Sequence, residues 1–531
     1  MQALYQLSYS PGLCSAGVSP RRLRQLYTQV APHCQIGGRP RSLPARTPGT
    51  GHPGTSGPVV SGRPRRPRTL EPSRVSTLQQ AAAGKWTLTL RDFLLRRPLL
   101  PTAAVCLASF AVFWTAQRFA EVTMVDLMVY RAEGWAARAG HDLYALRATY
   151  AHLPMTYPPF AALVFLPLTL LDVADMRTAA TALNLVLLLW VVHLSLRLLG
   201  HPVRLPRIAA TFLIGAAAVW CEPVWTTLRY GQINLLLAGL VLWDLSRRRG
   251  HPWAGVGIGV AAGIKLTPAL FVVFLALCGA ICGIRDLRRT GRAAQLWHPW
   301  LRQAAVATAA FCGTVLLAAL VLPRDSRRFW GEAIFQSSRV GRTEISANQS
   351  LSGVLARLLH VPEPGGVWAA AAALTVVLGL GAAVAAALAG SRRLPYAPAW
   401  AAVACAVTAL LISPISWSHH WVWCVPMFAL LLAEARRRPS RGRAGWALAV
   451  SAAALVFCSY ALWWVPRDPG SPHSPELHQN AGQMALSGLY PAVGFGFLVL
   501  TAVLAVRALR RPEPDGPADA GLRRWRRSRS V

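Results

Sequence analysis

Long apolar stretches separated by short basic segments dominate the chain after residue 98. Several of them reach the roughly 20 residues that a helix needs to cross a bilayer, and the shorter ones need bends or helical neighbours. The pattern predicts an all-α polytopic membrane protein with about 11–13 transmembrane segments. The stretches cover residues 99–119, 178–199, 208–221, 233–246, 252–264, 267–284, 303–322, 366–390, 398–413, 421–434, 445–464 and 484–508.

Composition and charge support membrane insertion. Of the 531 residues, 54% are hydrophobic and only 14% are charged, whereas a soluble chain averages about 25% charged residues. A net charge of +34 would on its own admit a nucleic-acid binder. The arginines, however, are dispersed over short loops and form no contiguous basic face, so we expect the lipid bilayer as a partner and no nucleic acid.

The basic residues also predict the topology. If the N-terminal tail and alternate loops lie inside, the inner face holds 41 of the 55 Lys and Arg residues but only 8 of the 21 acidic ones, as the positive-inside rule requires. Three parts follow: a disordered basic cytoplasmic tail (1–96), a membrane domain (97–510) and a second basic cytoplasmic tail (511–531). The predicted outer loops are 120–177, 222–232, 323–365, 414–420 and 465–483.

Two segments need a special arrangement under this topology. Residues 252–284 must start and finish inside, which predicts a hairpin with Lys265 near its outer bend; one long broken helix is the alternative. Residues 158–171 are too short to span, so we interpret them as re-entrant or interfacial.

The first outer loop carries a candidate base. On a helix, Asp126, Tyr130 and Glu133 share one face. Partial burial would raise the pKa of Asp126 towards that of a general base, although a helix-start or interfacial carboxylate fits the same position. Tyr157, held at the membrane boundary by the two prolines that follow it, is either a site residue or an interfacial tyrosine.

The next motifs place polar groups beside apolar segments. Arg229, Gln232 and Asn234 precede one such segment, where the two amides could bind a polyhydroxylated ligand or bond neighbouring helices. Lys265 stands alone between two apolar segments, where it could bind a phosphate, pair with a buried acid or extend to the membrane surface.

Two further motifs lie in the later outer loops. One is Asn348-Gln349-Ser350, and the other runs from Ser413 to the adjacent His419 and His420. Neighbouring residues point about 100° apart on a helix, so the two histidines form a poor metal pair. No DxD or HExxH motif occurs, and we expect neither a metal nor another cofactor.

The order of these motifs resembles that of glycosyltransferase family 87 over about residues 99–510. The order is Asp126, then Tyr-Pro-Pro at 157–159, Gly-Gln-Ile-Asn at 231–234, Ile-Lys-Leu-Thr-Pro at 264–268, Asn-Gln-Ser at 348–350, and Ser-Pro-Ile-Ser-Trp-Ser-His-His at 413–420. The resemblance implies a GT-C multi-helix bundle in the cell membrane, with an extracytoplasmic active site. It also implies Asp126 as the catalytic base.

The implied reaction moves a hexose, expected to be mannose, from a polyprenyl-phosphate donor to a membrane glycolipid or lipoglycan acceptor, forming an α-1,2 linkage with inversion. From the chemistry of the side chains, we expect Lys265 and one of His419 or His420, together with Arg229, to hold the donor phosphate. Polar side chains would contact the sugar or acceptor: Tyr130, Tyr157, Gln232, Asn234, Asn348 and Gln349. A transporter or lipid-linked-sugar flippase and an arabinofuranosyltransferase remain the alternatives.

Overall fold

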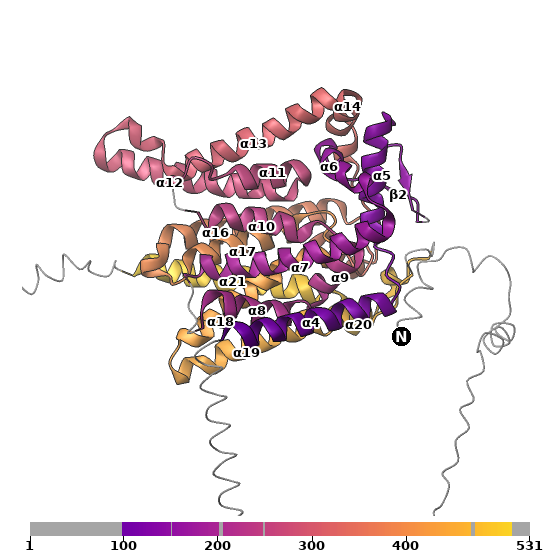
Figure 1. Ribbon diagram of the computed structural model, residues 1–531. Coiled ribbons are helices and arrows are strands. Elements are labelled where there is room, and N and C mark those ends of the chain that lie inside the picture. The colour runs from indigo at the N-terminus through magenta and orange to yellow at the C-terminus, as the bar shows by residue number, and fades with distance from the viewer. Residues whose placement is uncertain (1–97, 150, 201–204, 248–249, 469–472, 512–531) are drawn as a thin grey trace, which may run out of the picture. The chain divides into compact units, whose positions relative to one another are not determined.

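The computed structural model describes residues 98–149, 151–200, 205–247, 250–468 and 473–511. Both predicted tails lie outside these residues, apart from Arg511. Each predicted apolar stretch corresponds to a helix, and these helices run between two ends of a bundle (Figure 1). They are α4 (Leu99–Phe119), α7 (Val173–Leu198), α8 (Arg207–Ala218), α10 (Asn234–Leu245), α11 (Val256–Ile264), α12 (Leu270–Thr290), α13 (Pro299–Val321), α16 (Gly365–Arg393), α17 (Ala397–Ile412), α18 (Cys424–Arg437), α19 (Ser440–Cys458) and α21 (Leu489–Arg510).

The remaining elements are short, and most of them lie in the predicted outer loops. The helices are α5 (Val125–Ala139), α6 (Pro159–Phe165), α9 (Glu222–Tyr230), α14 (Pro323–Gly331), α15 (Leu351–Leu359) and α20 (Ala481–Ser487). The 3-10 turns are η1 (Leu166–Leu170), η2 (Thr267–Ala269), η3 (Ala293–Leu296), η4 (Ala333–Phe335), η5 (Ser337–Arg339), η6 (Ser418–Trp423), η7 (Ala461–Trp463) and η8 (Pro475–His478). Strands β1 (Arg147–Ala148) and β2 (Leu153–Pro154) pair antiparallel.

Within the described residues, seven helices are long and apolar enough to cross a membrane, or eight if α8 and α9, which are bent by 80°, form one span. The all-α polytopic prediction is therefore confirmed. The predicted total of 11–13 transmembrane segments is larger because it also counted α10, α11, α17 and α18. These helices have 9 to 16 residues and are shorter than the helices that are long enough to cross a membrane. The predicted re-entrant segment is a short helix, α6, that continues into η1.

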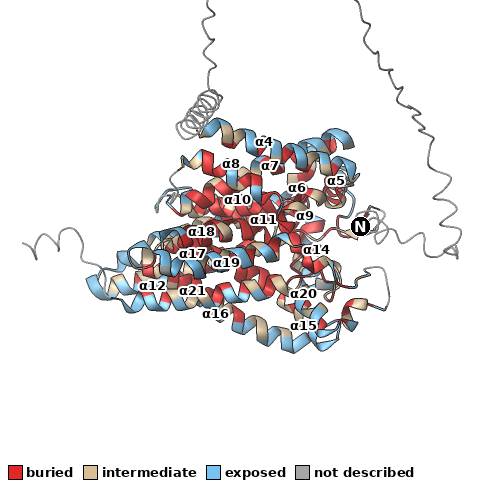
Figure 2. Cartoon of the chain, turned by 90° about the horizontal axis from the view of Figure 1, so that it is seen from below, coloured by how far each residue is buried: buried red, intermediate tan, exposed pale blue. Residues whose placement is uncertain are grey.

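The core of the bundle is packed, and its outer helices present apolar side chains outwards. Nearly all of α17 is buried, whereas α4, α13 and α19 each bury only 22% of their apolar windows. Leu107, Leu320 and Leu455 are about 70% exposed. Figure 2 shows buried residues in the middle of the bundle and exposed ones around it. Such large exposed apolar surfaces are expected where lipid surrounds the protein.

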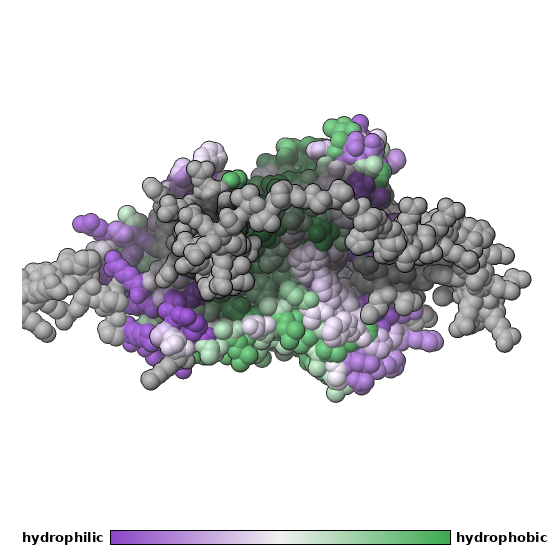
Figure 3. Space-filling model, turned by 60° about the horizontal axis from the view of Figure 1, so that its bottom comes forward, coloured by the Kyte–Doolittle hydropathy of each residue, from purple (hydrophilic) through white to green (hydrophobic). Residues whose placement is uncertain are grey.

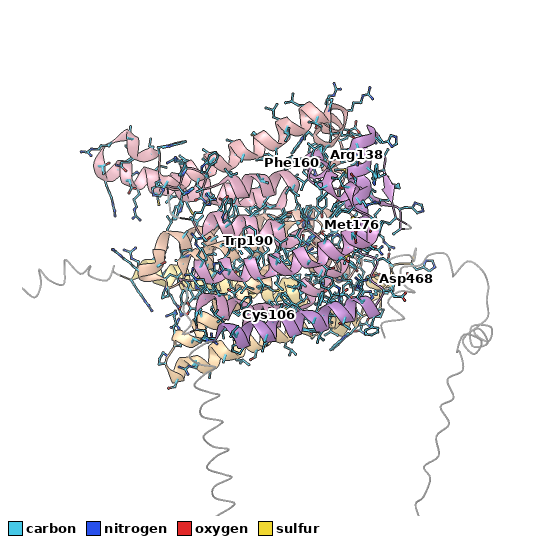
Figure 4. The ribbon with its side chains drawn as sticks, viewed as in Figure 1. Cys106, Arg138, Phe160, Met176, Trp190 and Asp468 are labelled. Atoms are coloured by element: carbon cyan, nitrogen blue, oxygen red, sulfur yellow. The ribbon has the colours of Figure 1, made fainter. Side chains whose placement is uncertain are left out.

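The surface pattern agrees with a protein that crosses a bilayer. Figure 3 shows hydrophobic residues across the middle of one face and hydrophilic residues gathered towards both ends. Cys106 and Trp190 lie along the bundle, while Arg138 and Asp468 lie at the end that carries the predicted outer loops (Figure 4).

Helices α11 and α12 form the predicted hairpin. Gly255, at the start of α11, packs against Gln303 of α13, and Gly263, near its end, packs against Thr314. Helix α12 then returns along α13, since its Gly279 packs against Leu301. The chain therefore reverses around Lys265, which ends α11 in an extended conformation (φ −148°, ψ 130°).

Candidate active site

The five predicted outer loops meet at one end of the bundle. Their cross-links include the Leu143 amide to Asp325 Oδ1 (2.9 Å), Thr227 Oγ1 to the His419 carbonyl (2.9 Å), the Gln349 amide to the Ser416 carbonyl (2.7 Å) and Ser474 Oγ to Glu344 Oε1 (3.1 Å). Four helices, α12, α16, α18 and α21, begin near these loops and carry arginines in their last turns, at the opposite end of the bundle. The predicted inner and outer segments therefore lie at opposite ends of the bundle.

A cavity of about 460 Å³ opens among these loops. Such a volume lies within the range of small-molecule and cofactor sites. Eight of the predicted site residues line it: Asp126, Tyr130, Tyr157, Arg229, Gln232, Lys265, His419 and His420. Three predicted amide side chains, those of Asn234, Asn348 and Gln349, do not.

Asp126 lies in the first turn of α5 and faces the cavity. Its Oδ2 accepts a hydrogen bond from Gln232 Nε2 at 2.7 Å. Burial raises the pKa of Asp126 to about 6, and the Gln232 bond and the charge of Lys265 oppose that rise. Oδ1 has no hydrogen-bond partner among the described residues. The carboxylate is thus fixed through one oxygen and available through the other.

Two tyrosines orient Gln232. The Tyr130 hydroxyl donates to Gln232 Oε1 at 2.7 Å and lies 3.0 Å from the Tyr157 hydroxyl. The Tyr130 ring stacks on Phe165 of α6 with 4.3 Å between centroids. Because its carbonyl oxygen is engaged by Tyr130, the amide group of Gln232 points its N–H towards Asp126.

Lys265 and His420 form a second polar pair in the cavity wall. Lys265 Nζ lies 2.9 Å from His420 Nε2 and 5.3 Å from the centroid of the Tyr157 ring. Lys265 precedes the candidate span that begins at Thr267, and burial lowers its pKa to about 7 while Asp126 opposes the shift. Burial and the charge of Lys265 hold the pKa of His420 well below its usual range. When Lys265 is protonated, a neutral His420 can therefore accept a hydrogen bond from its ammonium group.

The adjacent histidines diverge, as the sequence predicted. Their ring planes lie 88° apart, and His419 packs edge-to-face against Tyr230 with 5.6 Å between centroids. The His419 carbonyl accepts hydrogen bonds from Asn234 Nδ2 (3.0 Å) and Thr227 Oγ1 (2.9 Å). Asn234 therefore fixes the backbone that presents His420, and its placement differs from the expected contact with substrate.

Asn348 and Gln349 also lie elsewhere than expected. Both side chains are 0% exposed. Asn348 bonds to backbone groups of Thr343, Pro414, Ser350 and Ser416, and Gln349 Nε2 donates to the carbonyls of Ser346 and Ser487. These amides join the third outer loop to its neighbours. Neither side chain lines the cavity, so their bonds to neighbouring loops support the cavity wall.

Comparison with known proteins identifies the family. The model of glycosyltransferase family 87 matches residues 155–414. A Mycobacterium tuberculosis protein named polyprenol-phosphate-mannose-dependent alpha-(1-2)-phosphatidylinositol mannoside mannosyltransferase is 32% identical over 57% of this chain and 68% of its own length. The chain belongs to glycosyltransferase family 87. A second M. tuberculosis relative, named as the corresponding phosphatidylinositol pentamannoside mannosyltransferase, is 34% identical over 67% of this chain and 78% of its own.

Among solved structures, the family 87 chain is similar to ArnT from Cupriavidus metallidurans, crystallised with undecaprenyl phosphate. The TM-score is 0.38 and the identity 15%, over 76% of this chain and 77% of the other. The part matched by the family model includes Tyr157, Gln232 and Lys265, whereas Asp126 and His420 lie outside it. The cavity brings both groups of residues together.

Two features of this family 87 site were not found from the sequence. Glu222 is 0% exposed and accepts hydrogen bonds from Thr226, Ser418, Trp463 and Tyr490 at 2.7–3.0 Å. It joins α9 to the histidine loop and to α21. Arg339, which lines the cavity, donates to the carbonyls of Tyr144 and Met155. Most of their partners are distant in sequence, so no local pattern marks either residue.

Proposed function

We propose that this family 87 protein transfers a mannosyl group from a polyprenyl-phosphate mannose donor to a hydroxyl of a membrane glycolipid or lipoglycan, on the extracytoplasmic face and with an α-1,2 linkage. The names of its relatives support the donor, the sugar and the linkage. One observation supports the chemistry above all: a fixed carboxylate with one available oxygen shares a cavity with the Lys265–His420 pair.

The proposed reaction is a single displacement at the anomeric carbon. The acceptor hydroxyl donates its proton to Asp126 Oδ1 while its oxygen forms a bond to that carbon. The bond between the carbon and the donor phosphate oxygen breaks, and the phosphate leaves with the electron pair. One displacement converts a β-linked sugar phosphate into an α-glycoside, so a single base is sufficient.

The remaining residues of the cavity have complementary roles in this mechanism. Gln232 holds Asp126 in the orientation that leaves Oδ1 for the acceptor, and Tyr130 and Tyr157 hold Gln232. Lys265 neutralises the charge that develops on the leaving phosphate, with His420 as its partner; groups positioned before the reaction stabilise such charge effectively. Arg229, which also lines the cavity, would bind a second phosphate oxygen.

The charge partition supports the proposed face. The cavity lies at the end of the bundle where the predicted outer loops meet, and these loops carry few net positive charges. The arginine-rich helix ends lie at the opposite end of the bundle. By the positive-inside rule, arginine-rich segments remain in the cytoplasm. The active site would therefore open outside the cytoplasm, where a lipid-linked donor is needed because nucleotide sugars are confined within.

The test is transfer by the purified full-length protein. Radiolabelled polyprenyl-phosphate mannose would be incubated with a panel of membrane glycolipids, and the product linkage would be determined by mass spectrometry and mannosidase digestion. We expect an α-1,2-linked mannoside that is absent with Asp126→Asn. Transfer from polyprenyl-phosphate arabinofuranose in its place would replace mannose in the proposal, and donor movement across the membrane without any product would support a flippase.

A further inference from the structure

Glu133 is a second carboxyl group in the wall of the cavity. It lies seven residues after Asp126 on the same helix and is 1% exposed. It lines the cavity, yet its Oε2 has no hydrogen-bond partner within the described part of the chain. A buried polar atom without a partner is costly and needs an explanation.

The neighbouring tyrosines cannot supply that partner, because each hydroxyl is already used. Tyr130 donates to Gln232, Tyr157 lies within hydrogen-bond distance of Tyr130, and Tyr144 donates to the Tyr157 carbonyl at 3.0 Å. Because Glu133 lines the cavity, a molecule that enters the cavity is left as the candidate hydrogen-bond partner.

The position of Glu133 on α5 separates it from Asp126. Seven residues of α-helix advance the backbone by about 10 Å, so the two carboxyl groups are attached to different parts of the cavity wall. Burial, together with the charge of Asp126, holds the pKa of Glu133 well above its usual range. A protonated carboxyl offers one donor and one acceptor, which is the combination that a sugar hydroxyl requires.

We propose that Glu133 binds a non-reacting hydroxyl of the glycan in the cavity and so helps to determine which sugar is accepted. The inference rests on the proposed glycosyl transfer. The hydroxyl could belong to the donor sugar or to the acceptor, and kinetics with each substrate varied in turn distinguish the two. Glu133 acts in binding, whereas Asp126 acts on the reacting proton.

The experiment compares Glu133→Leu with Glu133→Gln in the full-length protein. Leucine removes both hydrogen-bonding groups, and glutamine retains a donor and an acceptor. We expect Glu133→Leu to raise the KM of one substrate about 5- to 100-fold, the effect of losing one hydrogen-bond partner, with kcat changed much less. Glu133→Gln should restore most of the affinity. A rise in the donor KM assigns the hydroxyl to the donor, and a rise in the acceptor KM assigns it to the acceptor.

The matched control is Glu476→Gln. Glu476 is also 1% exposed, and its Oε1 has no hydrogen-bond partner among the residues that the structure describes, but Glu476 does not line the cavity. Both KM values should therefore stay unchanged. If Glu133→Leu does not fold, Glu133→Asp, which withdraws the carboxyl by one methylene, takes its place.

Unchanged KM values for both substrates, or equal damage by leucine and glutamine in folded protein, would overturn the role of Glu133. Wild-type activity in the same assay tests the glycosyl transfer separately. The wild-type enzyme should also discriminate against one deoxy analogue of the affected sugar, and Glu133→Leu or Glu133→Asp should lose that discrimination.

Discussion

Replacing Asp126 by asparagine tests the proposed base most directly. The side chains have nearly the same size, and an asparagine oxygen can still accept the 2.7 Å hydrogen bond that Gln232 Nε2 donates to Asp126. The connection to Tyr130 is therefore expected to persist. The amide differs from the carboxylate in one property that matters here, since it cannot take up the proton of the acceptor hydroxyl.

The expected loss follows from that single change. Removing a positioned general base typically lowers the rate about 10²- to 10⁴-fold, which corresponds to about 2.7–5.4 kcal/mol of activation free energy. We expect kcat for Asp126→Asn to fall within this range. The dissociation constant for the donor should change only a few-fold, because Lys265 and His420 remain in place.

The assay is single-turnover transfer of radiolabelled mannose at saturating donor and acceptor, combined with direct measurement of donor binding. Glu133→Gln provides the matched control, since it changes another carboxyl on the same helix and should be much milder. A folded, donor-binding Asp126→Asn protein with near-normal turnover would refute the assignment of Asp126 as the base.

Three further predictions follow from the same geometry. Lys265→Met should raise the donor KM at least 10-fold while the melting temperature in detergent stays within a few degrees; an unchanged donor KM would remove Lys265 from the phosphate site. The wild-type kcat/KM should rise with pH as Asp126 loses its proton near pH 6 and fall as Lys265 loses its proton near pH 7. Lys265→Met should lack the fall at higher pH, and a pH-independent wild-type profile would contradict the roles of Asp126 and Lys265. In a background lacking reactive cysteines, a membrane-impermeant thiol reagent should label Asp468→Cys but not Arg438→Cys in intact cells, and the reverse result would invert the topology.

Much of the bundle could be predicted because its signals are local. An apolar stretch of sufficient length specifies a helix in lipid whatever its neighbours are, and each predicted stretch corresponds to one. The chain reversal at Lys265 was also predictable, since arginine-rich segments on both sides of 252–284 require an even number of crossings. Helix periodicity likewise placed Asp126 and Tyr130 on one face, and both line the cavity.

The site was less predictable where a side chain's role depends on partners distant in sequence. Asn348 resembles a ligand-binding amide because it sits in an outer loop just before the N-cap of α15, yet the groups that engage it include the Pro414 carbonyl. Glu222 gave no signal because its donors come from three other segments as well as its own helix. Such networks are properties of the assembled fold, and one stretch of sequence contains only one of the partners.

The close packing of α11 against α13 has a consequence for the cation at its end. Gly255, Gly259 and Gly263 let the two backbones approach so closely that a methyl group at any of these positions would collide with α13. Lys265 follows two residues later, so its position is set by the packing of α11 on α13 and not by a flexible loop. The entropic cost of immobilising this charge is therefore part of folding, and phosphate binding does not incur that cost a second time. We expect Gly263→Ala, whose added methyl group would meet the Thr314 side chain of α13, to displace Lys265 and weaken the response of the enzyme to its donor.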